Sequence, residues 1–325
     1  MRAIVIKQYG GPEQLVIEER PEPEPKPGHV VIEVKAFGVN HAETHMRKGE
    51  WPEITEVSGI ECVGLVRHDP DHRFAFGQKV TALMGGMGRT INGSYAELTC
   101  VPATNVVPIE TDLKWDELAA IPESYATAWT CLYGNLALAA GQTLVLRGAT
   151  SALGQAALNI AAEANVQVIA TTRNRERTSK LEGLGAGRVV LEGPDLSRRI
   201  RAIYPDGVDA VLDLVGNSSV LDSLATVRRG GRVCEAGWLG GLEPIADFNP
   251  MLQMPSGVQF SLFGSFMFGT SEFPLSDVPL QTIVDRVSSG AYRAKPARVF
   301  RFDEIREAHR LMESNEANGK IVVLH

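Results

Sequence analysis

The spacing of hydrophobic positions changes near residue 115. Before that point, short apolar runs are separated by glycine, proline and charged residues, which is typical of β-strands joined by turns. After it, apolar runs of strand length alternate with longer segments of helical periodicity, which predicts a parallel sheet with helical connections. The expected fold is therefore α/β, with a partly open, barrel-like β-domain and a doubly wound parallel sheet.

The first part of the chain is expected to be mainly strand, with one short helix over 41–48. The proline-rich stretch 21–28 is an extended connector, because proline cannot take part in the central ladder of a sheet. Strands are predicted over 2–7, 14–18, 30–39, 59–66, 77–82, 93–98 and 103–109.

In the second part, strands and helices alternate. Helices are predicted over 116–120 and 123–139, and strands at 144, 166, 189, 208–213, 231–235 and 260–265. The remaining tail is expected to form a helix, a strand, a helix and a strand, over 280–289, 297–302, 303–314 and 319–324. This tail is too short to bury its own apolar faces, so we expect it to return to the first domain. The predicted domains are 1–120 with 267–325, and 121–266.

Length and composition limit the class of protein. With 325 residues, the chain is long enough for about two domains, each with its own core. Its net charge of −7 argues against a general nucleic-acid-binding or anionic-membrane surface. The first residues lack the features of a signal peptide, no apolar run reaches transmembrane length, and the four cysteines lack C-x-x-C spacing. These observations favour a cytoplasmic protein with reduced thiols.

The stretch 144–158 has the pattern of a dinucleotide-binding strand, loop and helix. Gly148 permits a tight turn, and Gly154 lets the helix pack closely on the strand. The helix N-terminus offers free N–H groups and a positive dipole end to phosphates. Because Ala152 replaces the middle glycine of the motif, plain packing of small residues is the alternative explanation. The residues predicted to line the phosphates are Gly148, Ala149, Thr150, Ser151, Ala152 and Leu153.

The second strand of this unit, at 166–172, ends without the acidic residue that accepts the ribose 2′-hydroxyl of NAD. A basic run with hydroxyl groups follows it, and guanidinium groups bind a 2′-phosphate by paired, charge-assisted hydrogen bonds. The alternative is a solvent-exposed basic helix start. The position of the run favours NADPH as the cofactor, and the candidate residues are Thr172, Arg173, Arg177 and Lys180.

Further short motifs follow one another along the whole chain. They are Ala36–Asn40, Gly59–Glu61, Gly77–Val80, Gly93–Glu97, Ile121–Glu123, Thr127–Trp129, Gly148–Gly154, Asp213–Gly216 and Gly319–Val322. In this order, the chain resembles the medium-chain dehydrogenase/reductase superfamily, and it is most similar to the zinc-independent quinone oxidoreductases of the zeta-crystallin type. The resemblance implies a GroES-like catalytic domain, formed by the first part and the tail, and a Rossmann domain that binds NADPH.

The same resemblance bears on metal binding. Zinc-dependent members of the superfamily use a cysteine and a histidine where this chain has Asn40 and Ile60, and a third ligand near Glu123. Asparagine and isoleucine cannot supply a zinc site, and the four-cysteine structural lobe is missing. His41 and His45 lie at i, i+4 on one helical face, but the sequence shows no third and fourth ligand for them. We therefore expect no metal.

Without a Lewis acid, the acceptor must already be electron-poor. Quinones and α,β-unsaturated carbonyls meet this condition, so hydride transfer from NADPH to such an acceptor is the first hypothesis. Asn40 is a candidate to hydrogen-bond the substrate carbonyl, Thr127 matches a family position near the nicotinamide, and Tyr125 is a candidate proton donor. The structural alternatives are a turn-capping asparagine, a buried helical threonine and an aromatic residue that packs between the domains.

The resemblance adds candidates around the nicotinamide and the substrate. Those near the nicotinamide ribose and the cofactor are Gly237, Trp238, Leu239, Phe263 and Asn318, the last together with Lys320. Those for an apolar substrate cleft are Trp51, Met84 and Met87, which could equally be surface-loop residues without a role. Members of the family are often dimers, which predicts a homodimer with 260–268 at its interface.

Two other functions remain open from the sequence. An enoyl-thioester reductase would need a longer basic groove for its substrate, and a non-catalytic NADPH-binding protein would keep the fold without turnover. The intact cofactor loop and the glycine-rich cleft favour an enzyme with a small-molecule quinone or enone substrate.

Overall fold

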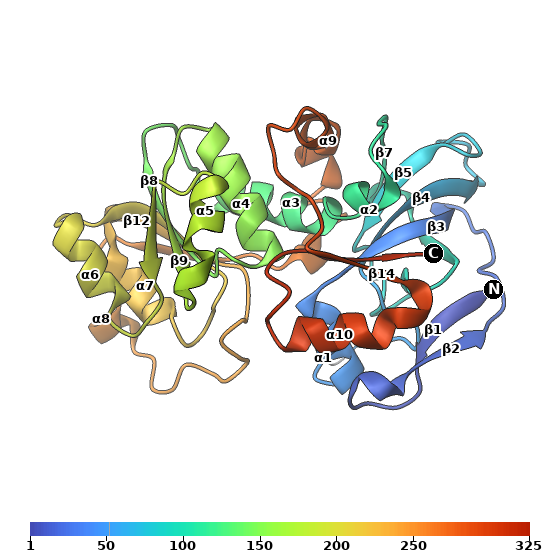
Figure 1. The fold of residues 1–325 in the computed structure, drawn as a ribbon, viewed down its shortest axis with the longest axis horizontal. Coiled ribbons are helices and arrows are strands. Elements are labelled where there is room, and N and C mark those ends of the chain that lie inside the picture. The colour runs from blue at the N-terminus through green and yellow to red at the C-terminus, as the bar shows by residue number, and fades with distance from the viewer. Residues whose placement is uncertain (52) are drawn as a thin grey trace. The chain divides into compact units, whose positions relative to one another are not determined.

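The structure is a computed structural model that describes residues 1–51 and 53–325, and the chain divides into two compact units (Figure 1). Unit 1 comprises residues 1–126 and 265–325, and unit 2 comprises residues 127–264. The tail therefore belongs to the first unit. The expected α/β fold, with a GroES-like domain and a parallel-sheet Rossmann domain, is confirmed.

The division between the units differs slightly from the predicted one. The sequence predicts domain ends at 120 and 266, whereas the structure divides the chain after 126 and 264. The start of helix α3 (Pro122–Trp129) belongs to unit 1, because the Glu123 N–H donates to Glu61 Oε2 at 2.8 Å and Tyr125 stacks on Tyr292. The boundary thus falls inside a helix, where no change of composition marks it.

Unit 1 contains a two-stranded sheet, β1-β2, and a seven-stranded sheet in the order β14-β15-β3-β4-β5-β7, with β6 paired to β3. The long strand β3 is central, because β4, β6 and β15 all pair antiparallel with it. The strands are β1 (Arg2–Ile6), β2 (Leu15–Glu19), β3 (His29–Val39), β4 (Glu61–His68), β5 (Lys79–Leu83), β6 (Leu98–Pro102), β7 (Val106–Pro108), β14 (Arg298–Arg301) and β15 (Ile321–Leu324). The helices are η1 (Pro12–Gln14), α1 (His41–Lys48), η2 (Ala103–Asn105), α2 (Trp115–Leu118), η5 (Ser265–Met267), η6 (Leu275–Asp277), α9 (Leu280–Ser288), η7 (Phe302–Glu304) and α10 (Ile305–Glu313).

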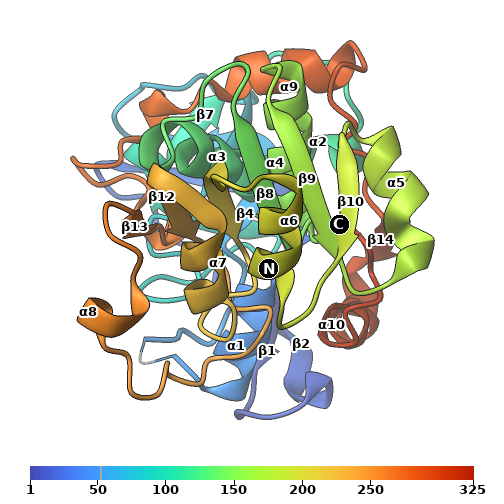
Figure 2. The ribbon, with the colours of Figure 1, turned by 90° about the vertical axis from the view of Figure 1, so that its left-hand side faces the viewer.

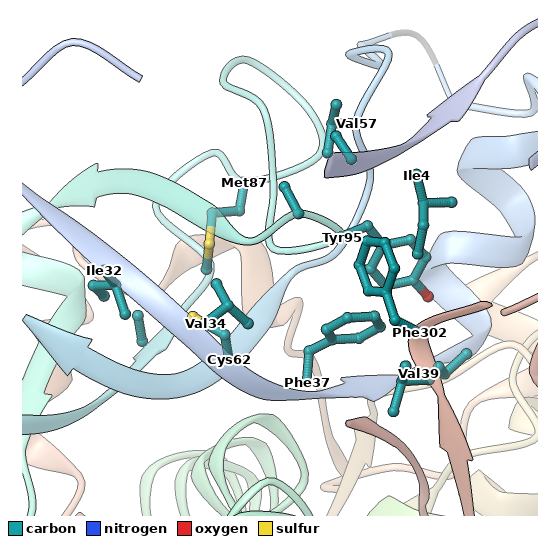
Figure 3. Packing of buried hydrophobic residues seen from close by; sticks show 14 of the residues in the cluster. Ile4, Ile32, Val34, Phe37, Val39, Val57, Cys62, Met87, Tyr95 and Phe302 are labelled. Atoms are coloured by element: carbon teal, nitrogen blue, oxygen red, sulfur yellow. The ribbon is translucent and has the colours of Figure 1, made fainter. Parts of the chain in front are cut away.

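The core of unit 1 gathers around Phe37 of β3 (Figure 3). Its ring lies 4.6 Å from that of Tyr95 and meets Phe302 edge-on at 6.4 Å, measured between ring centroids. Phe302 comes from the tail, so aromatic packing and the β15–β3 ladder both fix the tail to the first part of the chain.

Unit 2 contains a six-stranded parallel sheet in the order β10-β9-β8-β11-β12-β13 (Figure 2). The strand order reverses between β8 and β11, and ligands of such sheets bind at the carboxyl ends of the strands at this switch point. The strands are β8 (Thr143–Arg147), β9 (Gln167–Thr172), β10 (Arg188–Leu191), β11 (Val208–Asp213), β12 (Val227–Glu235) and β13 (Gln259–Leu262). The helices, besides the end of α3, are η3 (Thr130–Asn135), α4 (Ala152–Glu163), η4 (Arg175–Arg177), α5 (Thr178–Gly183), α6 (Leu196–Ile203), α7 (Val220–Thr226) and α8 (Pro250–Gln253).

Some predicted elements are wrong in detail. The long helix predicted over 123–139 ends as an α-helix at Trp129 and continues as the π-helical segment η3, with Ala137 at a φ of +43°. Gly134 and Asn135 are poor helix formers, which the apolar periodicity of this stretch concealed. Of the strand predicted over 103–109, only β7 is extended, and the strand expected over 93–98 forms instead as β6.

Candidate functional site

The loop between β8 and α4 has the backbone geometry of a phosphate-binding turn. Gly148 has a φ of +75°, and a Cβ there would lie 2.9 Å from Leu239 Cδ1. A Cβ on Gly154 would lie 2.5 Å from the Gly148 carbonyl oxygen, so glycine is required for α4 to pack this close. Ser151 caps α4, since its Oγ accepts the Gly154 N–H at 3.0 Å. The first turn of α4 and the loop therefore fit a diphosphate, which is the group that a nicotinamide dinucleotide would place here.

The remaining predicted loop residues line the same turn. Ala149 is fully buried, whereas Thr150, Ala152 and Leu153 are half-buried. The Ser151 hydroxyl also donates to the Gly148 carbonyl at 2.9 Å. The Ser151 hydroxyl thus links the first residue of the loop, Gly148, to the first turn of α4 at Gly154.

Two cationic side chains follow β9, and one of them contacts this loop. Arg177 Nη1 donates to Thr150 Oγ1 at 3.4 Å, which joins the end of η4 to the phosphate loop. Burial lowers the pKa of Lys180, and the neighbouring charge of Arg177 lowers it further. Thr172, at the end of β9, accepts the Asn174 N–H at 3.1 Å, while Arg173 is exposed. The role of these residues at a 2′-phosphate stays a prediction.

The loops after β11 and β12 meet the phosphate loop at the switch point. The Leu239 N–H donates to the Leu214 carbonyl at 3.1 Å, and a Cβ on Gly237 would lie 2.7 Å from the same carbonyl oxygen. Trp238 between them is half-buried. Phe263, after β13, is buried, and its N–H donates to the Glu235 carbonyl at 2.9 Å.

A buried ionic network beneath this site was missed by the sequence analysis. Arg147, the last residue of β8, donates from Nη1 to Asp222 and Ser223 at 3.0 Å each and also pairs with Glu192. Asp213, its neighbour at the end of β11, accepts from the Ser223 hydroxyl. The signal in the sequence is that a charged residue directly follows the apolar end of each of three strands, at Arg147, Asp213 and Glu235.

In unit 1, a lysine from the tail closes a second buried network. Lys320 Nζ donates to Asn40 Oδ1 at 2.6 Å and to Ser124 Oγ at 3.4 Å, and it forms an ion pair with Glu61. The side chain of Lys320 is 4% exposed and that of Glu61 is fully buried. The second oxygen of Glu61 accepts the Glu123 N–H. The network thus joins β4, α1, α3 and β15.

Asn40 has partners for both ends of its side-chain amide. Its Nδ2 donates to Glu61 Oε1 at 3.0 Å and to Glu43 Oε1 at 3.4 Å, while its oxygen accepts from Lys320. Glu43 in turn accepts the N–H groups of Asn40 and Ile60 at 2.8 and 3.2 Å. Burial raises the pKa of Glu43 to about 7 against the opposing charge of Lys320. The orientation of Asn40 is therefore fixed by three charged neighbours.

The other predicted catalytic residues have these positions. Tyr125 is buried and stacks on Tyr292 of the same unit at 5.6 Å between ring centroids, so this contact is not the packing between domains that was expected as its alternative. Thr127 is buried in the part of α3 that belongs to unit 2. Asn318, just before β15 in unit 1, has a φ of +51°. Their roles in catalysis or cofactor binding stay predictions.

Two of the predicted cleft residues line one cavity in unit 1. This cavity, called the methionine cavity below, has a volume of about 190 Å³ and is lined by Glu53, Met84, Gly86, Met87, Arg89, Thr90 and Phe266. Met84 has a φ of +59°, which is uncommon for a residue with a side chain. Trp51 lies near it, because Arg89 is placed over both the Trp51 and Phe266 rings.

The site residues bear on metal binding as well. Within residues 1–51 and 53–325, no three histidine, cysteine, aspartate or glutamate side chains gather as metal ligands. His45 pairs with Glu50 and stacks on Trp51, while burial and the neighbouring His45 lower the pKa of His41 to about 4. At Asn40, the ammonium group of Lys320 already neutralises the Glu61 carboxylate, and it would repel a divalent cation.

No helix within the described ranges has both the length and the apolar character needed to cross a bilayer.

Two family models match the chain: the alcohol dehydrogenase GroES-like domain over residues 26–111, and the zinc-binding dehydrogenase family over residues 184–323. The quinone oxidoreductase of Lama guanicoe is 27% identical over 100% of this chain and 97% of its own length.

Solved structures show the same fold. An NAD-dependent alcohol dehydrogenase is 26% identical, with a TM-score of 0.86 and full coverage of both chains. A mycobacterial protein complexed with NADPH is 25% identical, with a TM-score of 0.87 and the same coverage. Fold, site and relatives define an oxidoreductase that uses a nicotinamide cofactor and a small-molecule substrate. The chain belongs to the medium-chain dehydrogenase/reductase superfamily, in its quinone oxidoreductase branch.

Proposed function

We propose that this protein reduces quinones or α,β-unsaturated carbonyls with NADPH, by hydride transfer and without a metal. The observation that carries the proposal is the Asn40–Glu61–Lys320 network. A lysine ammonium group satisfies the carboxylate and the amide in the region where the zinc-dependent members supply ligands. A simple alcohol would have no Lewis acid there to stabilise its alkoxide. An acceptor with a conjugated carbonyl needs less help, because conjugation spreads the developing charge.

Phosphate recognition supports NADPH as the cofactor. A 2′-phosphate at the end of β9 would face Arg177 and Lys180, whose positive charges would both attract an anion. Thr150 already holds Arg177 beside the loop. The nicotinamide would supply the hydride, and the chain would supply binding, orientation and exclusion of water.

Three named residues would act on the acceptor side. Lys320, Glu61 and Glu43 fix the carboxamide of Asn40, so its N–H groups would have to leave the two carboxylates to donate to a substrate carbonyl. Tyr125, packed on Tyr292, and Thr127 on the same helix would complete the proposed catalytic set. The proton that reduction requires would come from one of these hydroxyl groups or from solvent.

The test is NADPH oxidation with 1,4-benzoquinone, 9,10-phenanthrenequinone, a simple enone and an enoyl thioester. We expect turnover of the quinones or the enone, faster with NADPH than with NADH. Preferred turnover of the thioester would instead identify an enoyl-thioester reductase. Tight NADPH binding without turnover of any acceptor would identify a non-catalytic NADPH-binding protein.

We also propose a homodimer in which β13 contributes the interface. This strand lies at the edge of the parallel sheet, and its Phe260 and Leu262 are 39% and 54% exposed. An open edge strand with exposed apolar side chains favours pairing with a second chain. A monomeric mass in sedimentation analysis would contradict the dimer.

A further inference from the structure

The methionine cavity contains one cationic group among apolar walls. Met84 and Met87 are buried, and Phe266 forms another wall. The Arg89 guanidinium lies 5.2 Å from the Phe266 ring centroid and 5.8 Å from that of Trp51. Both rings lie within the distance at which a cation–π contact stabilises a guanidinium group. A ligand in the cavity would therefore lie next to the guanidinium group of Arg89.

The guanidinium group of Arg89 is only partly satisfied by the protein. Its Nη2 donates to Glu53 Oε2 at 3.3 Å, but the Glu53 side chain is 58% exposed, so this ion pair is weak. Its Nε is buried and has no hydrogen-bond partner among the residues that the structure describes. A buried N–H without an acceptor is costly, and a ligand oxygen would remove that cost.

Hydrogen bonds fix the backbone segments that form the walls of the cavity. Gly86 accepts the N–H groups of Arg89 and Thr90 at 3.0 and 2.8 Å, which folds the loop back on itself. Asn105 donates to the carbonyls of Leu83 and Phe268 at 3.0 and 2.9 Å and so ties the Phe266 segment to the end of β5. Both walls of the cavity are thus fixed by hydrogen bonds within unit 1, and those of Asn105 are buried.

The cavity adjoins the proposed catalytic network of the same unit. Leu83, the residue before Met84, pairs with Glu61 in the β4–β5 ladder, and the Met84 N–H donates to the Ile60 carbonyl at 2.7 Å. The backbone that carries Met84 is therefore the direct neighbour of the strand end that carries Glu61.

We propose that Arg89 binds a carboxylate on the acceptor, so that the preferred substrates are conjugated carbonyl compounds that carry an acidic group. This inference rests on the proposed function. A carboxylate offers two oxygens in the plane that a guanidinium group recognises, and it supplies the acceptor that Nε lacks. In the reaction, the C=C bond gains a hydride at one carbon and a proton at the other, the nicotinamide is oxidised, and the carboxylate stays unchanged.

The test compares two acceptors that share one enone, (E)-4-oxopent-2-enoate and its methyl ester. We expect kcat/KM with NADPH to be higher for the acid by roughly tenfold or more, mainly through KM, as for loss of a charge-assisted hydrogen bond. Arg89→Met should remove this preference and leave the ester unaffected, and Arg89→Lys should keep part of it. Arg73→Met, at an exposed arginine of the same unit, is the matched control and should change neither.

Equal kcat/KM for acid and ester in the wild type would overturn the inference, as would an equal loss for both in Arg89→Met. Turnover of quinones with none of either enone would overturn it too, while the proposed function stood. Binding of the saturated acid, 4-oxopentanoate, separates the two claims. If no acceptor is reduced, binding that Arg89→Met abolishes would uphold the carboxylate site while the proposed function failed, and the absence of binding would overturn both.

Discussion

Glu235 provides a test of the buried network beneath the cofactor loop. It ends β12 beside Asp213 of β11, and its side chain is almost fully buried. Asp213 accepts hydrogen bonds from the Ser219 and Ser223 hydroxyls and from the Gly216 N–H, whereas Glu235 Oε1 has no partner among the described residues. Burial, with the charge of Asp213 as a second cause, raises the pKa of Glu235 from 4.5 to about 7.

The magnitude follows from this shift. A rise from 4.5 to about 7 corresponds to about 3 kcal/mol of preference for the protonated form in the folded state. That stability is fully present below the unfolded pKa of 4.5 and is lost as the pH rises through about 7. Between pH 5 and pH 8, the unfolding free energy of the wild-type protein should therefore fall by about 2 kcal/mol relative to that of Glu235→Gln.

The assay is urea unfolding of both proteins across this pH range, followed by the fluorescence of Trp129 and Trp238 in unit 2. The difference between the two proteins isolates Glu235 from the other titrating groups, including Glu43 and the buried histidines. Glu182→Gln, at an exposed glutamate of the same unit, is the control and should follow the wild type. Parallel curves for wild type and Glu235→Gln, or a wild type that gains relative stability toward pH 8, would refute the reasoning.

Three further substitutions test the two sites. Lys320→Met leaves the Glu61 charge buried without its partner, so the unfolding free energy should fall by about 3 to 5 kcal/mol, measured by urea unfolding; a loss below about 1 kcal/mol would contradict the ion pair. Gly154→Ala forces α4 away from the Gly148 carbonyl and should weaken NADPH binding at least about tenfold by fluorescence titration. Arg177→Ser should raise the KM for NADPH about tenfold and leave that for NADH unchanged, and an equal rise for both would remove Arg177 from the 2′-phosphate site.

Local pattern was sufficient to predict most of the fold. Strand β11 and helix α1 coincide with their predicted ranges, because each has uninterrupted periodicity and clear ends. The segment after Trp129 was not predictable in this way, since it changes from α- to π-helical bonding, as in the Leu136 N–H that donates to the Cys131 carbonyl at 2.9 Å. The π-helical segment has only six residues, which is too short for its different period to be recognised in the sequence.

The candidate sites differ in the same way in how far the sequence predicts them. The phosphate loop is contiguous in sequence, so small residues before a helical pattern were enough to predict its position. The Asn40–Glu61–Lys320 network joins residues far apart in the chain, and only the β15–β3 and β3–β4 ladders bring them together. Arg147 and Arg89 were overlooked for a similar reason. A charged residue at the end of a strand or in a glycine-rich loop has the same sequence signal whether it is solvated or buried.

The most direct test of the central claim is NADPH oxidation with 9,10-phenanthrenequinone by protein that has been treated with a chelator and analysed for metal. The proposed function predicts that the rate with NADPH is unchanged by the chelator, exceeds the rate with NADH, and is not increased by added zinc. Oxidation of simple alcohols that the chelator abolishes and zinc restores would contradict it.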